Sequence, residues 1–187
     1  QALSTRGLSA IAGLNISNTL NNVVNTFFLT MGIAISIVIG QLIGAGKLKE
    51  AKETDTKMIT FSLMISLGVS ALLLIAAPLF PRIYNTTGEI RYLATRFILV
   101  YVLATPFNAF TNAAYFTLRS GGKTVMTFIF DSGFIWAVNV PVAMLLAHFT
   151  NLPIVWMFFI ISMLDAIKSV VGFILVKKGD WLNIIVE

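Results

Sequence analysis

The sequence predicts an all-α, polytopic membrane protein with five transmembrane helices. Hydrophobic residues make up 57% of the 187-residue chain and charged residues only 11%, whereas a soluble domain carries about a quarter charged residues. Mean hydropathy is +0.89, so too little polar surface is available to cover a globule in water. This composition excludes a soluble enzyme, a nucleic-acid-binding domain and a disordered chain.

Five apolar runs carry the prediction of five helices. Each is longer than the roughly 20 residues with which a helix crosses the hydrocarbon core. They are too long and too continuously apolar for strands of a barrel, and a helix pairs its own backbone groups in lipid. The expected spans are residues 9–44, 58–84, 90–118, 124–149 and 154–176. Polar segments end them in turn: the charged run 47–57, predicted as a solvated amphipathic linker, then 85–89, 119–123, 150–153 and 177–179.

Basic residues in these polar segments predict the orientation, because Lys and Arg concentrate on the cytoplasmic side. One side carries Lys47, Lys49, Lys52, Lys57, Arg119, Lys123, Lys177 and Lys178. The other carries Arg6, Arg82 and Arg91, with Arg96 about a turn and a half into the third span. We therefore expect a cytoplasmic C-terminus and an external N-terminus. An external start without a signal sequence predicts that the chain is a fragment lacking upstream helices.

The first span combines a polar face with a row of small residues. Its polar face carries four amides at spacings of 3, 4 and 3 residues: Asn15, Asn18, Asn22 and Asn25. Amides facing lipid are costly, so this face either hydrogen-bonds neighbouring helices or lines a wet cavity, and both alternatives stay open. The small residues recur every four positions and predict close helix packing: Gly32, Ser36, Gly40 and Gly44.

Two prolines predict weak points in the third and fourth spans. Pro106 removes a backbone hydrogen bond and kinks the third helix. A second polar stripe follows on one face: Asn108, Asn112 and Tyr115. We interpret kink and stripe as a hinge beside a cavity wall, and the alternative is a kink repaired by neighbouring side chains. Pro141, next to Asn139, predicts a second hinge.

Charged residues at membrane depth are candidates for function, because they are expensive there. Asp165 lies near the middle of the fifth span with Lys168 three residues later, which favours a structural ion pair between them. The alternative is a protonatable carboxylate that exchanges partners during transport. Asp131 either pairs with Arg119 or Lys123, or lines an inner cavity.

The remaining aromatic and polar residues carry little functional information. Aromatic residues near the predicted membrane interfaces are expected to form interfacial belts: Tyr84, Tyr92, Trp156 and Trp181. No metal-ligand spacing, phosphate-binding loop or nucleophile–base set occurs in the sequence. We therefore expect neither an enzyme nor a cofactor.

Three segments resemble the multidrug and toxic compound extrusion (MATE) transporters. Gly40-Gln41-Leu-Ile-Gly44-Ala45-Gly46-Lys-Leu-Lys-Glu-Ala51 resembles a helix-end motif of that family. Leu118-Arg119-Ser-Gly121-Gly-Lys123-Thr124 resembles a later loop, and Trp136 with Pro141 fits the next span. The similarity runs along nearly all of the chain. It implies helices eight to twelve of a twelve-helix fold, that is, most of one six-helix lobe.

The resemblance also implies a function. The parent protein would be a secondary-active transporter of the plasma membrane that exports organic, often cationic, compounds in exchange for Na⁺ or H⁺. The implied partners are membrane lipid, a small organic substrate and the missing N-terminal lobe, with no nucleic acid. The alternatives are a lipid-linked oligosaccharide flippase of the same superfamily and a non-transporting membrane scaffold subunit. A flippase would need a cluster of Arg or Lys at membrane depth to hold a pyrophosphate head group, and the sequence has no such cluster.

The cation-coupling site of some members does not carry over to this sequence. Those members have Asp where Phe107-Asn108-Ala109 stands and an acid near Lys123, whereas this chain has Asn and Lys. The candidate residues of a substrate or ion pathway are therefore Asn18, Asn22, Asn25, Asn108, Asn112, Tyr115, Asp131, Asn139 and Asp165, with hinges at Pro106 and Pro141.

Overall fold

The computed structural model describes residues 7–150 and 152–182, and all regular elements in these ranges are helical. The long helices are α1 (Leu8–Gly44), α2 (Leu48–Leu79), α3 (Gly88–Ser120) and α6 (Ile154–Lys178). A short 3₁₀ turn, η2 (Phe80–Ile83), continues α2. The fourth span is composite: α4 (Thr124–Phe128), η3 (Ile129–Gly133), η4 (Ile135–Asn139) and α5 (Val140–Phe149). Five helices in the described residues are long and apolar enough to cross a membrane, which confirms the predicted fold class.

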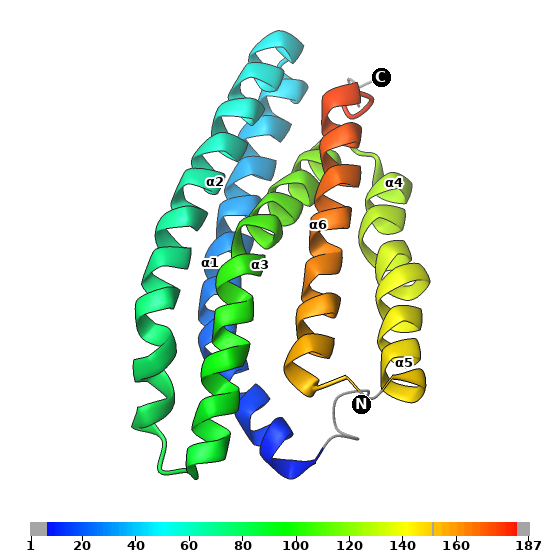
Figure 1. The fold of residues 1–187 in the computed structure, drawn as a ribbon. Helices are drawn as coiled ribbons and strands as arrows, with labels where there is room; N and C mark the ends of the chain where they lie inside the picture. Colours follow the sequence, from blue (N-terminus) through cyan, green and yellow to red (C-terminus); the bar gives the residue numbers. More distant parts are fainter. Residues whose placement is uncertain (1–6, 151, 183–187) are drawn as a thin grey trace.

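Helix α3 is the centre of the bundle and makes its most extensive contacts with α1, α2 and α6. Figure 1 shows α3 beside α1 and α2 over its first half, after which the helix bends and runs towards the C-terminal end of α6. Pro106 lies inside this helix, near its middle. Because proline removes a backbone hydrogen bond, a bend in the middle of α3 agrees with the kink expected at this residue.

The fourth span is not the uniform helix that the sequence predicts. Two π-helical turns, η3 and η4, separate α4 from α5. Pro141 lies in the first turn of α5, directly after η4, where its missing N–H does least damage. This span lies at the edge of the bundle (Figure 1), and no residue of η4 or α5 is buried. Local widening of a helix of this kind occurs frequently at functional sites.

The charged run is amphipathic, as expected, but it is no linker between helices: from Leu48 onwards it forms the first turns of α2, with Lys47 as the N-cap. Every fourth residue from Ala51 is buried, namely Ala51 and Asp55 in this run and Ile59 just after it. That spacing forms one face of a helix, which packs against the neighbouring helices while the lysines stay exposed. The turn between α1 and α2 is correspondingly short, and Gly46 adopts a positive φ of 72° in it.

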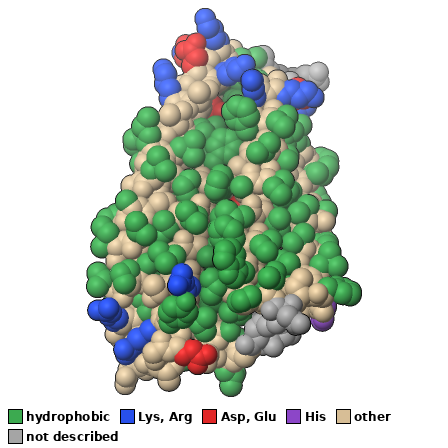
Figure 2. All heavy atoms as spheres, viewed as in Figure 1, with side chains coloured by type: hydrophobic (Ala, Val, Ile, Leu, Met, Phe, Trp, Pro, Cys, Tyr) green, Lys and Arg blue, Asp and Glu red, His purple; other side chains and the backbone are tan. Residues whose placement is uncertain are grey.

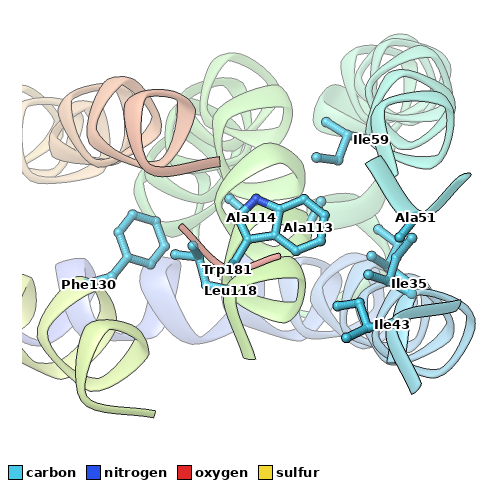
Figure 3. Close-up of a cluster of buried hydrophobic side chains, with 10 residues drawn as sticks. Ile35, Ile43, Ala51, Ile59, Ala113, Ala114, Leu118, Phe130 and Trp181 are labelled. Carbon is cyan, nitrogen blue, oxygen red and sulfur yellow. The ribbon is translucent and has the colours of Figure 1, made fainter. Parts of the chain in front are cut away.

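A cluster of ten buried hydrophobic residues lies at the end of the bundle where α1 meets α2 and α3 meets α4 (Figure 3), and a smaller cluster joins α3 to α6 around Phe97 and Phe158. Trp181 is only 1% exposed and packs in the larger cluster beside Leu118. Gly179 allows this arrangement because its φ of 78° lets the chain turn back after α6. The Trp181 indole Nε1 donates a hydrogen bond to the Val176 carbonyl at 3.0 Å. The prediction that Trp181 is an interfacial belt residue was therefore wrong.

The row of small residues on α1 packs tightly at one position. A Cβ on Gly32 would overlap the ring of Phe116 on α3, so glycine is required for this approach. A Cβ added to Gly40 or Gly44 would meet no atom of the described residues within 4 Å. Close packing through this row is thus observed at Gly32, and not at the other two glycines.

The surface agrees with a membrane-spanning bundle. Figure 2 shows a broad band of hydrophobic side chains between two ends where basic and acidic side chains gather. Large apolar residues such as Leu67 and Phe61 are about 60% exposed, as expected where lipid replaces water.

Candidate functional site: a polar cavity between α1, α3 and α6

A cavity of about 720 Å³ opens between α1, α3, η3 and α6. It joins the two polar stripes predicted from the sequence, which lie on different helices. Its walls are formed by Asn22, Asn25, Thr26, Leu29, Ile33, Asn108, Thr111, Asn112, Tyr115, Phe116, Arg119, Asp131, Asp165 and Lys168. Seven of these were candidates from the sequence, whereas Asn18 and Asn139 lie outside the cavity wall.

The amide face of α1 divides between the two roles that were left open. The side chain of Asn18 is half-buried and accepts a hydrogen bond of 2.6 Å from the Tyr101 hydroxyl on α3. Asn22 and Asn25 are exposed and line the cavity, and Asn15 is exposed elsewhere. In this stripe, Asn18 therefore hydrogen-bonds a neighbouring helix, whereas Asn22 and Asn25 line the cavity.

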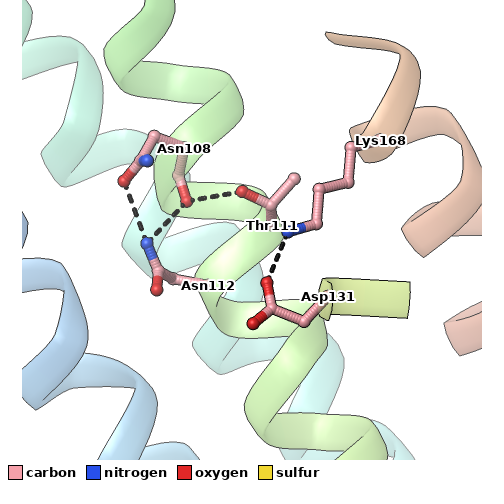
Figure 4. A network of polar contacts seen from close by, with 5 residues as sticks. All are labelled: Asn108, Thr111, Asn112, Asp131 and Lys168. Atoms are coloured by element: carbon pink, nitrogen blue, oxygen red, sulfur yellow. Dashed lines mark hydrogen bonds and ion pairs between the residues drawn. The ribbon is translucent and has the colours of Figure 1, made fainter. Parts of the chain in front are cut away.

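The stripe on α3 forms a preorganised polar wall (Figure 4). The Asn112 amide donates to the Asn108 carbonyl at 3.0 Å and to its side-chain Oδ1 at 2.9 Å. The Thr111 hydroxyl donates to the same carbonyl at 3.0 Å. Because these local bonds hold the side chains in place, the amide atoms that remain are available to a ligand without reorganisation.

An interhelical ion pair crosses the cavity wall, and it is not the pair that the sequence favours. Lys168 Nζ lies 2.6 Å from Asp131 Oδ1 (Figure 4), with its charge 5.2 Å from the centre of the Phe130 ring. Among the described residues Lys168 forms no ion pair with Asp165, and Asp131 forms none with Arg119 or Lys123. The spacing of Asp165 and Lys168 places them on one face, yet it does not reveal that η3 supplies a second carboxylate to that face.

Asp165 is consequently the acidic group of the cavity that lacks a close partner. Within the described part of the chain, its half-buried carboxylate forms neither a hydrogen bond nor an ion pair. It also borders a second, small cavity of about 50 Å³ whose polar lining includes Asn21, Tyr101 and Ser162. Asp131 and Lys168 pair with each other, so Asp165 and Arg119 are the ionisable residues of the cavity wall that form no ion pair in the described part of the chain.

The proposed hinges have distinct surroundings. Next to Pro106, the Phe107 carbonyl accepts a hydrogen bond of 3.2 Å from the Ser169 hydroxyl, which joins α3 to α6. Next to Pro141, the half-buried Asn139 has a buried Oδ1 with no hydrogen-bond partner in the described residues. Flexing of the chain at either proline stays a prediction.

The sequence analysis missed a buried polar pair outside the cavity. The carboxylate of Asp55 on α2 is 1% exposed and accepts a hydrogen bond of 2.6 Å from the Thr117 hydroxyl on α3, which is fully buried. The sequence contains a signal for this burial, because Asp55 lies four residues from both Ala51 and Ile59 and therefore shares a helix face with two apolar residues. Two basic residues of the cavity, Arg119 and Lys168, were also not counted among the candidates.

The fold and the cavity together define a class of protein. Helices of membrane-spanning length border a polar cavity that contains ionisable side chains, an arrangement that occurs in membrane transport proteins. The comparison with known proteins gives the family. Residues 2–145 match the model of the MatE family, and the chain belongs to this family.

Its relatives are named as multidrug proteins. A "Probable multidrug resistance protein YoeA" of Bacillus subtilis is 28% identical over 154 residues, which cover 80% of this chain and 33% of the relative. A "Probable multidrug resistance protein NorM" of Oceanobacillus iheyensis is 27% identical, covering 66% of this chain and 28% of the relative. The human "Multidrug and toxin extrusion protein 1" is 23% identical, and the match covers 76% of this chain and 25% of the relative. The chain thus spans a third or less of each of these relatives, and no solved structure matches it.

Proposed function

We propose that the chain is part of a secondary-active transporter that exports organic, often cationic, compounds in exchange for Na⁺ or H⁺. The cavity between α1, α3 and α6 is part of the transport path. The observation that carries this proposal is the convergence of two amide stripes and two carboxylates on one cavity of about 720 Å³ in a bundle of membrane-spanning helices.

The charges of the cavity support exchange between two cations. Asp165 offers a carboxylate without a close partner, and Asp131 offers one that is held by Lys168. A cationic substrate and a coupling cation would compete for these carboxylates. Because binding free energies are reciprocally linked, loading of one cation then weakens the binding of the other. The amides on α1 and α3 would bind the polar parts of the substrate.

The surroundings of the cavity follow from the same proposal. The protein lies in the plasma membrane with the Lys-rich end of the bundle and the C-terminus in the cytoplasm. A second lobe of the same protein faces this one and completes the path, which is supported by relatives three to four times longer than the matched region. The chain would then supply helices eight to twelve, and the transport step is rocking of the two lobes.

Two other functions fit the structure less well. A scaffold subunit would bury its polar stripes between helices, yet Asn22 and Asn25 are exposed on the cavity wall. A lipid-linked oligosaccharide flippase would need unpaired basic groups at depth for a pyrophosphate. Lys168 pairs with Asp131, and Arg119, the other basic residue of the cavity, lies in the last turn of α3 and not at mid-depth.

Substituted-cysteine labelling tests whether the cavity contains water. The chain has no cysteine, so Asn22→Cys and Asn108→Cys can be introduced singly and exposed to a membrane-impermeant maleimide in vesicles. Two controls accompany them: Val170→Cys, 60% exposed on the apolar surface, and Ala113→Cys, 2% exposed in the core.

We expect labelling at both cavity positions and none at the two controls. All four variants should react after denaturation, which checks that each cysteine is present and reactive. Silence at Asn22→Cys and Asn108→Cys in vesicles, followed by full reaction after denaturation, would support packing and contradict the proposed path.

A further inference from the structure

A separate groove on the bundle has no part in the proposed transport path. It has a volume of about 510 Å³ and lies between α3 and the start of α6. Its walls are almost entirely apolar and are formed by Tyr92, Leu93, Arg96, Leu99, Val100, Leu103, Pro153, Ile154, Val155, Trp156 and Phe159. Arg96 is the charged residue among them, and none of the described residues that line the groove is acidic.

Arg96 lacks a counter-charge in the described part of the chain. Its side chain is exposed and forms no ion pair there, and its guanidinium lies 5.1 Å from the centre of the Tyr92 ring. An unpaired cation beside an apolar groove at membrane depth is costly. Arginine binds phosphate oxygens with two parallel hydrogen bonds, so a phosphate would supply the missing charge.

The depth of Arg96 matches the level of lipid phosphates. Helix α3 bends near Pro106, so the depth of Arg96 is measured from the start of the helix at Gly88, beside the polar segment 85–89. Arg96 lies about 12 Å along the helix from Gly88. Its guanidinium is thus near the boundary between headgroups and acyl chains.

The rest of the groove fits the remainder of a lipid. Leu99 and Leu103 follow Arg96 on the same face of α3, in the direction of the bilayer centre. Phe159 forms the opposite wall, and Trp156, 59% exposed, lies at the mouth as interfacial tryptophans do. An acyl chain can therefore lie along this groove while its phosphate contacts Arg96.

We propose that the groove between α3 and α6 binds one anionic phospholipid, with its phosphate on Arg96 and an acyl chain along Leu99 and Leu103. The site is independent of the polar cavity and of the substrate. An anionic lipid is favoured over a zwitterionic one because a choline group would compete with Arg96 for the phosphate. A basic group at the level of the lipid headgroups attracts an anionic headgroup more strongly than a zwitterionic one.

Native mass spectrometry of the full-length protein tests the proposal. The delipidated protein is titrated with phosphatidylglycerol or phosphatidylcholine, and the occupancy of the tightest lipid site is measured. We expect Arg96→Gln to weaken phosphatidylglycerol binding about fivefold, as one basic group contributes to binding of an anionic membrane lipid. Leu103→Trp keeps the charge but fills the groove, and should weaken binding as well.

Arg82→Gln is the matched control, because Arg82 is an exposed arginine at the same end of the bundle but outside the groove. It should leave the tightest site unchanged, and thermal unfolding should show that each variant is folded. Equal losses for Arg96→Gln and Arg82→Gln would overturn the proposal in favour of general charge attraction. Equal binding of both lipids, or displacement of phosphatidylglycerol by inorganic phosphate at equal concentration, would overturn it too.

Discussion

The ion pair between Lys168 and Asp131 predicts an asymmetric response to mutation. The Lys168 side chain is 10% exposed, whereas the Asp131 side chain is 42% exposed and borders the cavity. Replacing Asp131 by Asn removes the carboxylate that contacts the buried ammonium and leaves only the more distant Asp165, three residues earlier on α6, near it. Replacing Lys168 by Met leaves a carboxylate that cavity water can solvate. Asp131→Asn should therefore destabilise the protein more than Lys168→Met.

The magnitude follows from burial. Breaking a fully buried pair costs about 3–5 kcal/mol, and the partial exposure of Asp131 lowers this to about 2 kcal/mol. A loss of this size lowers the unfolding midpoint of a chain of 150–250 residues by about 4–8 °C. The double variant Asp131→Asn/Lys168→Met should recover part of the loss, because no buried charge remains unpaired.

Thermal unfolding of the purified protein in detergent measures these differences. The surface pair Lys47–Glu50 is a matched control, since its side chains are 56% and 59% exposed. Glu50→Gln should cost less than about 1 kcal/mol. The reasoning is refuted if Asp131→Asn costs no more than Glu50→Gln, or if the double variant is less stable than Asp131→Asn.

Three further variants test the packing around α3, each by the unfolding midpoint in detergent. Trp181→Ala should cost about 3–5 kcal/mol because it empties the core at the end of α3, and a cost below 1 kcal/mol would contradict that placement. Gly121→Ala should destabilise by about 1–3 kcal/mol, since its Cβ would overlap the Trp181 backbone; an unchanged midpoint would show that the turn adapts freely. Thr117→Val keeps the side-chain shape but removes the hydrogen-bond donor to buried Asp55, which should lower the stability by about 1–3 kcal/mol. Thr117→Ser keeps the donor and should retain most of the stability.

The helices could be predicted from the sequence because their cause is local. An apolar run longer than the hydrocarbon core must form a helix in lipid, whatever its neighbours are. The first turns of α2 were missed because their exposed lysines dominate the composition. The buried positions Ala51 and Asp55 are small or charged and do not look like a core.

The polar stripes of the site were also predictable, since helical periodicity places Asn22 with Asn25 and Asn108 with Asn112 on shared faces. What the sequence did not reveal is which helix faces which. Lys168 pairs with Asp131 because η3 packs beside α6, and Asn18 meets Tyr101 because α1 packs along α3. Trp181 is buried because the chain turns back at Gly179, a tertiary event without a hydropathy signal.

Gradient-driven transport by the full-length protein in proteoliposomes tests the central claim most directly. A fluorescent organic cation such as ethidium is the probe, and a Na⁺ or H⁺ gradient is imposed. We expect transport that collapses with the gradient and falls at least tenfold in Asp165→Asn, while Val170→Thr on the lipid-facing surface transports normally. Transport by Asp165→Asn at the unaltered rate, or accumulation that ignores both gradients, would contradict the assignment of this cavity to a cation-exchange path.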